Sequence, residues 1–394
     1  MSRLVPVAWL SLFLVSSFMV QVVATGHVSP PIAEPPHERV AAFTSLFVAR
    51  SGTVVCGFQL GSAKHAVDCT LRLCQSTDGG ATWSVLTPRF PTEIEGIPGS
   101  LAGAEIVEPT PGTWLLFSTW FDRSDPDRPL FNPETEGLLR SRQVVSVSTD
   151  AGATWSRWRT IATPGLSGCA ATGPALRGLR GEVGFAFESF KEFDDPAPAR
   201  HGAWLLLSRD GGESFPELHL VAQDPAHEVY YWDQRLCPGT EPGSYVALFW
   251  THDRRTQRDL PVHIAHGQLG QPAWQAPVST GVIGQIAAPL VLPDGRLLMF
   301  VVDRNSPATM SLWVSHDRGQ TWPVTDRVVV YAHDEQARLT QGAENVDFAE
   351  YWEDMRRWTF GHPALRLLPD GTVLAVWYAG VPGSMGIRWA RLHT

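Results

Sequence analysis

The sequence has few lysines and few cysteines, and it lacks the short fingerprints of the common enzyme classes. Only Lys64 and Lys191 are lysines among 394 residues, and acidic residues outnumber basic ones by 40 to 31. The net charge of −9 argues against a nucleic-acid scaffold. There is no Gly-x-Ser-x-Gly elbow, His-Glu-x-x-His motif, phosphate loop or dinucleotide fingerprint. We therefore expect no cofactor and no metal, because His252, His263 and His362 are too scattered to suggest a metal site.

Long apolar runs are also scarce, and the only one lies at the N-terminus. Arg3, a mostly apolar stretch over 10–23 and the small residue Ala24 are typical of a secretory signal peptide, with a membrane anchor as the alternative. We predict a signal peptide at 1–24, a Pro-rich leader at 25–39 and one folded domain at 40–394. The protein is then secreted or periplasmic, free of the membrane after cleavage, and expected to be a monomer.

The five cysteines do not have the spacing of a metal site. Export permits disulfides, so Cys56 could pair with Cys69 or Cys74 on a neighbouring strand. Cys169 and Cys237 fall on later strands, and one thiol must stay unpaired. The alternative is that the cysteines are small buried residues.

A motif of the form Ser-x-Asp-x-Gly-x-Thr-Trp occurs four times with small variations, at 76–83, 148–155, 208–215 and 315–322. Asp followed by Gly favours a tight turn, because Asp bonds nearby backbone N–H groups and Gly accepts a positive φ. Each copy follows an apolar strand-like run. Each is therefore predicted to be a hairpin turn closed by an apolar plug, and a degenerate copy at 262–274 has lost the Asp.

A second set of turns precedes the first set. Pro-Asp-Gly at 293–295 and 369–371 is a specific hairpin signal, and related turns lie at 50–53, 110–112, 178–181 and 241–243. Six outer strands are expected at 71–75, 144–148, 203–208, 261–266, 310–315 and 386–392. A repeat of about 50 residues with several strands is typical of a β-propeller. We predict an all-β, six-bladed β-propeller with four-stranded antiparallel blades.

The predicted strand order decides which face can carry a site. The short hairpin turns share one face, and the long loops at 121–141, 189–201 and 328–359 share the other. A short helix is expected within 345–357. Long loops on a rigid scaffold are where sites are usually built.

The repeated turn resembles the Asp box, or BNR repeat, of sialidases (neuraminidases). The stretch 115–127 followed by 144–155 is similar to the sialidase segment that runs from a strand, through an Arg and a loop Asp, into an Asp box. The resemblance implies that Asp125 or Asp127 is the general acid. Residues 361–371 with Tyr378 also look like a late sialidase blade. The resemblance covers about 40–394.

The predicted loop face collects acids, arginines and aromatics. Tyr231, Asp233 and Arg235 alternate along an inner strand and so share one side. Glycosidases normally use two carboxyl groups, whereas sialidases use a Tyr nucleophile activated by an acid. The catalytic candidates are Tyr231, Asp233, Glu105, Asp122 and Asp125. The substrate-binding candidates are Arg123, Arg235, Arg304, Gln285, His362, Tyr378 and Trp232.

Guanidinium groups bind carboxylates in bidentate fashion, so three arginines on one rim suit an anionic sugar. The structural alternative is that these arginines pair with neighbouring acids and tie blades together. The sequence also departs from the family, because 40–46 contains no Arg where sialidases have an Arg-Ile-Pro motif.

The prediction is a sialidase-like glycoside hydrolase that cleaves a terminal anionic sugar from an extracellular glycan or polysaccharide. The alternatives are a non-catalytic glycan- or protein-binding propeller and a polysaccharide lyase acting on uronic acids.

Overall fold

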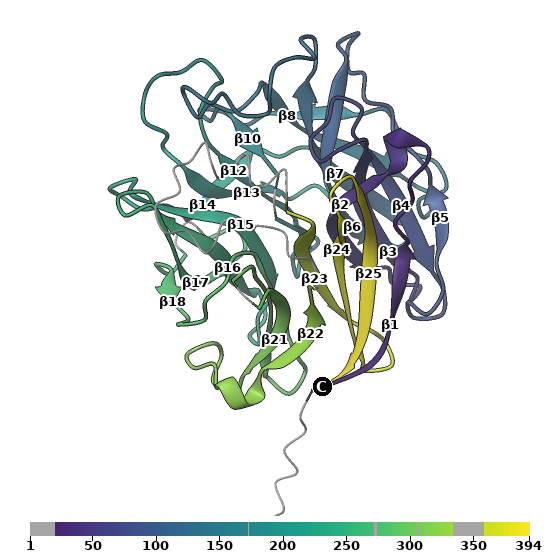
Figure 1. The fold of residues 1–394 in the computed structure, drawn as a ribbon, viewed down its shortest axis with the longest axis vertical. Coiled ribbons are helices and arrows are strands. Elements are labelled where there is room, and N and C mark those ends of the chain that lie inside the picture. The colour runs from purple at the N-terminus through teal and green to yellow at the C-terminus, as the bar shows by residue number, and fades with distance from the viewer. Residues whose placement is uncertain (1–19, 172, 272–273, 306, 334–357) are drawn as a thin grey trace, which may run out of the picture.

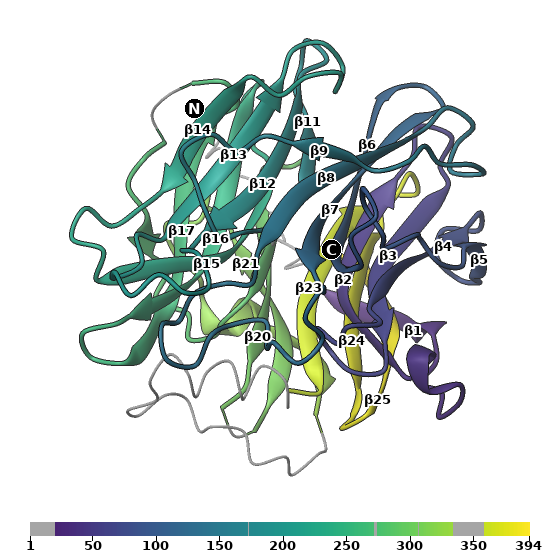
Figure 2. The same cartoon turned by 90° about the horizontal axis from the view of Figure 1, so that it is seen from above.

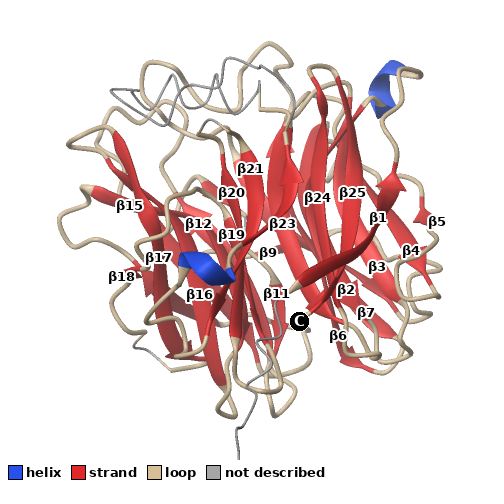
Figure 3. Cartoon of the chain, turned by 60° about the horizontal axis from the view of Figure 1, so that its bottom comes forward, coloured by secondary structure: helices blue, strands red, loops and turns tan. Residues whose placement is uncertain are grey.

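The protein is built from β-sheets arranged around a common centre (Figures 1 and 2). The computed structural model describes residues 20–171, 173–271, 274–305, 307–333 and 358–394. Within those ranges the helical elements are two single turns of 3₁₀ helix, η1 (Pro36–Glu38) and η2 (Val324–Asp326) (Figure 3). This confirms that the fold is all-β and propeller-like.

Four sheets of four or five strands follow one another along the described chain. The first contains β6 (Gly99–Thr110), β7 (Thr113–Asp122), β8 (Ser141–Ser148) and β9 (Arg159–Ile161). The second contains β10 (Cys169–Ala170) and β11 (Ala175–Arg177), which both pair with β12 (Val183–Ser189), and then β13 (Gly202–Ser208) and β14 (Glu217–Ala222). The third contains β15 (Val229–Pro238), β16 (Ser244–Asp253), β17 (Arg258–Gln268) and β18 (Val278–Ser279). The fourth contains β19 (Ala287–Val291), β20 (Leu297–Asp303), β21 (Thr309–Ser315) and β22 (Val328–Ala332).

The remaining described strands form one eight-stranded sheet that joins the two ends of the chain. Its path runs through β23 (Phe360–Leu367), β24 (Val373–Val381), β25 (Ser384–His393), β2 (Val40–Val48), β3 (Val54–Gly61), β4 (Thr70–Ser76) and β5 (Ser84–Thr87). The link between β25 and β2 is a single parallel pair, Val40 with Met385. The described strands thus give four separate blade-like sheets and one larger sheet, so the six-blade count stays a prediction.

Strand β1 (Gln21–Ser29) was not predicted from the sequence. It pairs antiparallel with β25, from Gln21 opposite His393 to Ser29 opposite Ile387 (Figure 1). The sequence instead predicts that 21–24 belong to the signal peptide and 25–29 to the leader. Most of β1 is exposed, so its apolar burial is small and its pairing with β25 is what holds it.

The core lies between neighbouring sheets, and this explains why many strands are apolar on both sides. All eight residues of β3 are buried, and so are six of the seven of β20. Phe117 of one sheet stacks on Phe185 of the next, with ring centroids 4.6 Å apart. Such continuous burial produces apolar runs instead of the alternation expected of a sheet with one wet face.

The innermost strands contact one another in a closed circuit. Strand β2 touches β6 and β23, β6 touches β11, β15 touches β12 and β19, and β19 touches β23. Residues at corresponding positions of the inner strands therefore face one central channel.

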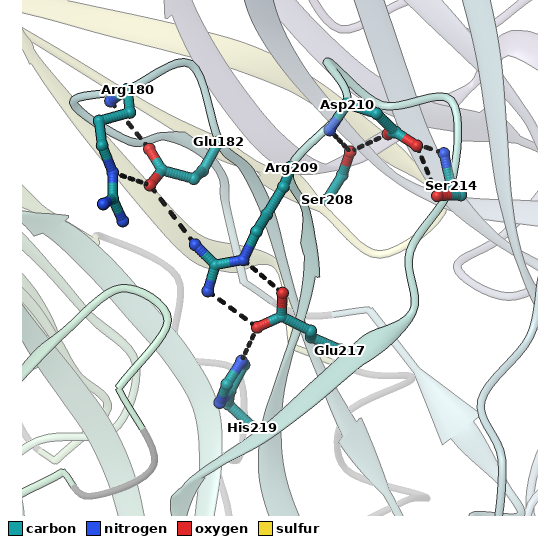
Figure 4. Close-up of polar contacts among 8 residues, drawn as sticks. All are labelled: Arg180, Glu182, Ser208, Arg209, Asp210, Ser214, Glu217 and His219. Atoms are coloured by element: carbon teal, nitrogen blue, oxygen red, sulfur yellow. Dashed lines mark hydrogen bonds and ion pairs between the residues drawn. The ribbon is translucent and has the colours of Figure 1, made fainter.

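Each of the four repeated Ser-x-Asp turns connects two strands that are adjacent in the sequence, as predicted; the pairs are β4 and β5, β8 and β9, β13 and β14, and β21 and β22. In the turn shown in Figure 4, the Ser208 hydroxyl donates to Asp210, 2.6 Å, and Asp210 accepts the Ser214 backbone N–H, 2.9 Å. Equivalent bonds join Asp150 to Thr154 and Asp317 to Thr321. These aspartates thus accept hydrogen bonds within their own turns and stabilise the local backbone.

The five cysteines are buried thiols, and the structure forms no disulfide between them. Cys56 and Cys74 lie directly opposite each other on β3 and β4. Burial raises the pKa of Cys69, Cys169 and Cys237 to about 12, so these thiols are poor nucleophiles in the folded protein.

None of the helical elements that the structure describes has the length or apolar character to cross a membrane. The helix expected within 345–357 and the apolar stretch up to residue 19 lie outside the described residues.

Candidate functional site

Four innermost strands carry the same irregularity, a β-bulge in which two residues oppose one residue of the next strand. The first residue of each bulge has a left-handed φ: Phe43 (55°), Gly103 (78°), Asp233 (48°) and His362 (55°). This conformation costs a residue other than Gly on the order of 1 kcal/mol. All four residues line one pocket. Backbone strain repeated around one pocket marks it as the candidate functional site.

The second residues of two bulges, Thr44 and Gln234, fasten their strands to neighbouring ones. The Thr44 hydroxyl donates to the carbonyl of His362. The Gln234 amide donates to the carbonyl oxygens of Phe187, 2.6 Å, and Trp204, 3.0 Å. These buried bonds hold the strained residues in place and so preorganise the pocket.

The pocket encloses a cavity of about 90 Å³ and opens to solvent. Its polar groups come from Glu188, Asp233, Arg304, His362 and Tyr378, with His65 beside them. The rest of the lining is mainly apolar and includes residues of the segments that follow β7 and β12. The pocket therefore lies on the face where the sequence predicted long loops.

Arg304 follows β20 and is 4 % exposed. Its guanidinium donates to the Gln285 side chain and to the carbonyl of Phe360, and it lies 4.0 Å from the ring centroid of Trp358. Its Nε is buried and has no hydrogen-bond partner among the described residues. The Arg304 guanidinium is thus held at the pocket and still has N–H donors that the described residues do not use.

Gly361 makes room for this arrangement. Its φ is 146°, and a Cβ at this position would collide with the Arg304 guanidinium and come within 3.3 Å of the Tyr378 hydroxyl oxygen. Only Gly satisfies both the conformation and the close approach.

Tyr378 lies on β24, is 3 % exposed and contacts the pocket. Burial raises the pKa of its phenol, and the neighbouring Arg304 acts in the opposite direction. The ammonium of Lys64 lies 5.5 Å from the ring centroid. The phenol is therefore neutral in the resting protein and requires a base to become a nucleophile.

Asp233 supplies a carboxyl group beside these residues. Burial raises its pKa, while Arg235 and Arg304 oppose that rise. The charge of Asp233 also contributes to raising the pKa of Tyr378, although less than burial does. A carboxylate with a raised pKa is a stronger base than an exposed one, which suits proton abstraction from a phenol.

His362 is held as a neutral imidazole. Its Nδ1 lies 3.0 Å from the carbonyl oxygen of Thr44 and so carries the proton, leaving Nε2 to accept from Arg235. Burial, reinforced by Arg235, lowers the pKa of His362 well below its usual value. His362 thus orients Arg235 and does not supply a positive charge.

A smaller cavity lies further along the inner strands and contains Glu105, Arg235 and Arg366. Burial raises the pKa of Glu105 to about 7, against the opposing effects of Arg235 and Arg366. Glu105 is not among the residues that line the larger pocket. Glu105 thus lies in a different cavity from Asp233 and Tyr378, where its neighbours are two arginines of the inner strands.

Other predicted catalytic residues also lie outside the pocket. Tyr231 points into an intersheet cluster, with its ring 5.5 Å from Phe249 and 6.0 Å from His263. Asp122 and Asp125 line a separate surface cavity, where Asp122 accepts bonds from Ser124. The side-chain alternation of β15 that placed Tyr231 beside Asp233 is interrupted by the bulge, so the two residues do not share a side.

The predicted binding residues divide in the same way. Arg304, His362, Tyr378 and Trp232 line the pocket. Gln285 supports Arg304, and Arg235 supports His362. Arg123 does not line the pocket and donates to Ser100 and to the carbonyl of His65.

Sequence reasoning missed Phe43, His65 and Lys64. The Phe43 ring packs at a tilt against His65, with centroids 4.6 Å apart, and meets His362 edge-on at 5.3 Å. Burial lowers the pKa of Lys64 well below its usual value. The rarity of lysine was a usable signal, since both lysines of the chain are buried.

None of the described residues form a group of three or more His, Cys, Asp or Glu side chains suited to a metal ion.

Comparison with known proteins identifies the fold but not a family. No family model and no curated protein matches this sequence. A Dyadobacter fermentans protein of unknown function is 18% identical with a TM-score of 0.70, and the match covers 95% of this chain and 99% of that one. A Hadza microbial sialidase is 16% identical with a TM-score of 0.66, covering 93% and 68%.

A third solved structure is the intramolecular trans-sialidase from Ruminococcus gnavus, in complex with oseltamivir carboxylate. It is 12% identical with a TM-score of 0.58, covering 90% of this chain and 95% of that one. At these identities the similarity shows a shared fold. The chain thus has the propeller-like fold that sialidases use, and its chemistry must be argued from its own pocket.

Proposed function

We propose that this protein is a sialidase-like glycoside hydrolase in which Tyr378 is the nucleophile and Asp233 is its base. The observation that carries the proposal is the convergence of Tyr378, Asp233 and Arg304 on one strained, preformed pocket. A Tyr nucleophile activated by a neighbouring acid is the known exception among glycosidases, and it is the one that sialidases use.

In the proposed reaction, Asp233 takes the phenol proton as the Tyr378 oxygen bonds to the anomeric carbon. The bond to the leaving group breaks, and the leaving oxygen receives a proton from Glu188, the second carboxyl of the pocket. Water, deprotonated by Glu188, then displaces the Tyr378 oxygen, and the phenol regains its proton from Asp233. Arg304 binds an anionic or hydroxyl group of the sugar with its remaining donors.

The proposal includes the finer features expected from the sequence. We count the eight-stranded sheet as two blades joined by the pair Val40 and Met385, which makes six blades around the channel. The partner is a glycan or another glycoside, and the protein acts after export as a monomer. Signal cleavage after Ala24 would remove the first four residues of β1, so N-terminal sequencing of the exported protein tests that site directly.

A panel of 4-methylumbelliferyl glycosides that includes sialosides and uronides tests the proposed function. We expect turnover of at least one member by the native protein and loss of about 10³-fold in kcat for Asp233→Asn. No turnover on the whole panel, combined with tight binding of a glycan, would contradict the hydrolase and favour a binding module.

A further inference from the structure

The pocket combines its polar groups with an apolar zone. The residues that form this zone carry no side-chain nitrogen or oxygen; they are Phe121, Leu130, Phe131, Leu138, Phe190 and Ile286. A sugar hydroxyl placed against them would lose its hydrogen bonds to water without replacement, which is unfavourable. The part of the ligand in this zone must therefore be apolar.

The apolar zone is preformed. The segments after β7 and β12 are joined by a backbone bond from Leu138 to Lys191, 3.0 Å, and by a bond from the Asn132 side chain to the carbonyl of Phe193, 3.0 Å. Phe131 meets Phe190 edge-on with centroids 5.7 Å apart. These contacts lie within the protein itself, so the two segments hold each other in place and little ordering is needed on binding.

The polar groups of the same pocket are the side chains of Glu188, Asp233, Arg304, His65, His362 and Tyr378, and three Trp side chains add indole N–H groups. Gln285 and Phe360 each accept one of the five Arg304 N–H donors, so Arg304 keeps donors for one sugar, whereas the apolar zone offers no group to satisfy a second sugar ring. A ligand with one sugar at the polar groups and an apolar group in the apolar zone matches the chemistry of both parts of the pocket.

We infer that the substrate is a glycoside with an apolar aglycone, of the alkyl or aryl class, and that the zone around Leu130 and Phe131 binds this aglycone. This inference rests on the proposed function for the claim that the polar part of the ligand is a sugar. The apolar subsite itself is inferred from the side chains that line it.

The subsite is tested by binding of N-phenyl-1-naphthylamine, an uncharged apolar probe that fluoresces when it leaves water. We expect saturable binding to the native protein at one site and a loss of affinity of about tenfold in Leu130→Asn, since a half-buried apolar contact is replaced by an amide. The matched control is Leu179→Asn, because Leu179 is 70% exposed on a hairpin turn outside the pocket. Phe131→Ala serves as a second variant, and its thermal unfolding shows whether its loop still folds.

No saturable binding, or equal binding by Leu130→Asn and Leu179→Asn, would overturn the inference. The probe does not use the polar groups, so Tyr378→Phe should bind it as the native protein does. An active enzyme without a probe site would refute the apolar subsite alone, whereas a probe site without turnover would refute the proposed function alone. For whichever sugar is turned over, the octyl glycoside should exceed the methyl glycoside in kcat/KM by about tenfold or more.

Discussion

Replacement of Glu105 by Gln should stabilise the folded protein above neutral pH and leave turnover in place. Glu105 is 7% exposed, and burial raises its pKa to about 7 from an ordinary value near 4.5. The folded state therefore holds this proton more tightly than the unfolded state does. The ionised side chain accordingly destabilises the fold progressively as the pH rises from about 4.5 to about 7.

The magnitude follows from the size of the shift. A rise of this size corresponds to about 3 kcal/mol of unfolding free energy that is missing above pH 7. Glu105→Gln removes the ionisation while keeping the shape of the side chain. The gain should reach about 3 kcal/mol at high pH and disappear below the unfolded pKa of Glu.

Urea unfolding followed by tryptophan fluorescence, at pH 4 and pH 8.5, measures this gain, and the aryl glycoside panel measures turnover. A variant that is less stable than the native protein at pH 8.5 would refute the reasoning, because it would mean that Arg235 and Arg366 outweigh the cost of burial. A large loss of kcat in a well-folded variant would return Glu105 to the catalytic group.

Three further outcomes are expected. Asp150→Ala should leave kcat unchanged and make the free energy of unfolding less dependent on pH between about pH 4 and pH 2. The reason is that the Thr154 hydrogen bonds lower the pKa of Asp150 to about 2, and their contribution to stability is lost over that range. A loss of activity in a fully folded variant would contradict a structural role for Asp150. Gly361→Ala should displace the Arg304 guanidinium and lower kcat/KM by about tenfold or more with little change in far-UV circular dichroism, and native activity would contradict the close packing. The five thiols should be unreactive to Ellman's reagent in the native protein and all titrate in guanidinium. Three titrating thiols would instead show that one disulfide has formed, for which Cys56 and Cys74 are the cysteines that lie opposite each other.

The propeller-like fold was predictable because its signals are local. Each Ser-x-Asp turn is built from hydrogen bonds within about five residues, and each Pro-Asp-Gly hairpin joins strands adjacent in sequence. Strand β1 was not predictable in this way, because its partner β25 lies at the opposite end of the chain.

The site was only partly predictable, and the reason is the bulges. Period-two alternation along 229–238 places Tyr231 beside Asp233, but the extra residue in β15 turns the two side chains apart. Asp233, Arg304, His362 and Tyr378 were identified as candidates, yet the pairing of Asp233 with Tyr378 requires strands that are far apart in sequence to meet at the channel. Phe43 carried no local signal, because its left-handed backbone arises from the packing of neighbouring inner strands.

Two tyrosine variants show whether Tyr378 is the nucleophile. Tyr378→Phe and Tyr231→Phe each remove one hydroxyl from a tyrosine of the propeller, one inside the pocket and one outside it. On the aryl glycoside that the native protein hydrolyses, we expect a loss in kcat of about 10³-fold or more for Tyr378→Phe and near-native kcat for Tyr231→Phe. Near-native turnover by Tyr378→Phe would contradict the account.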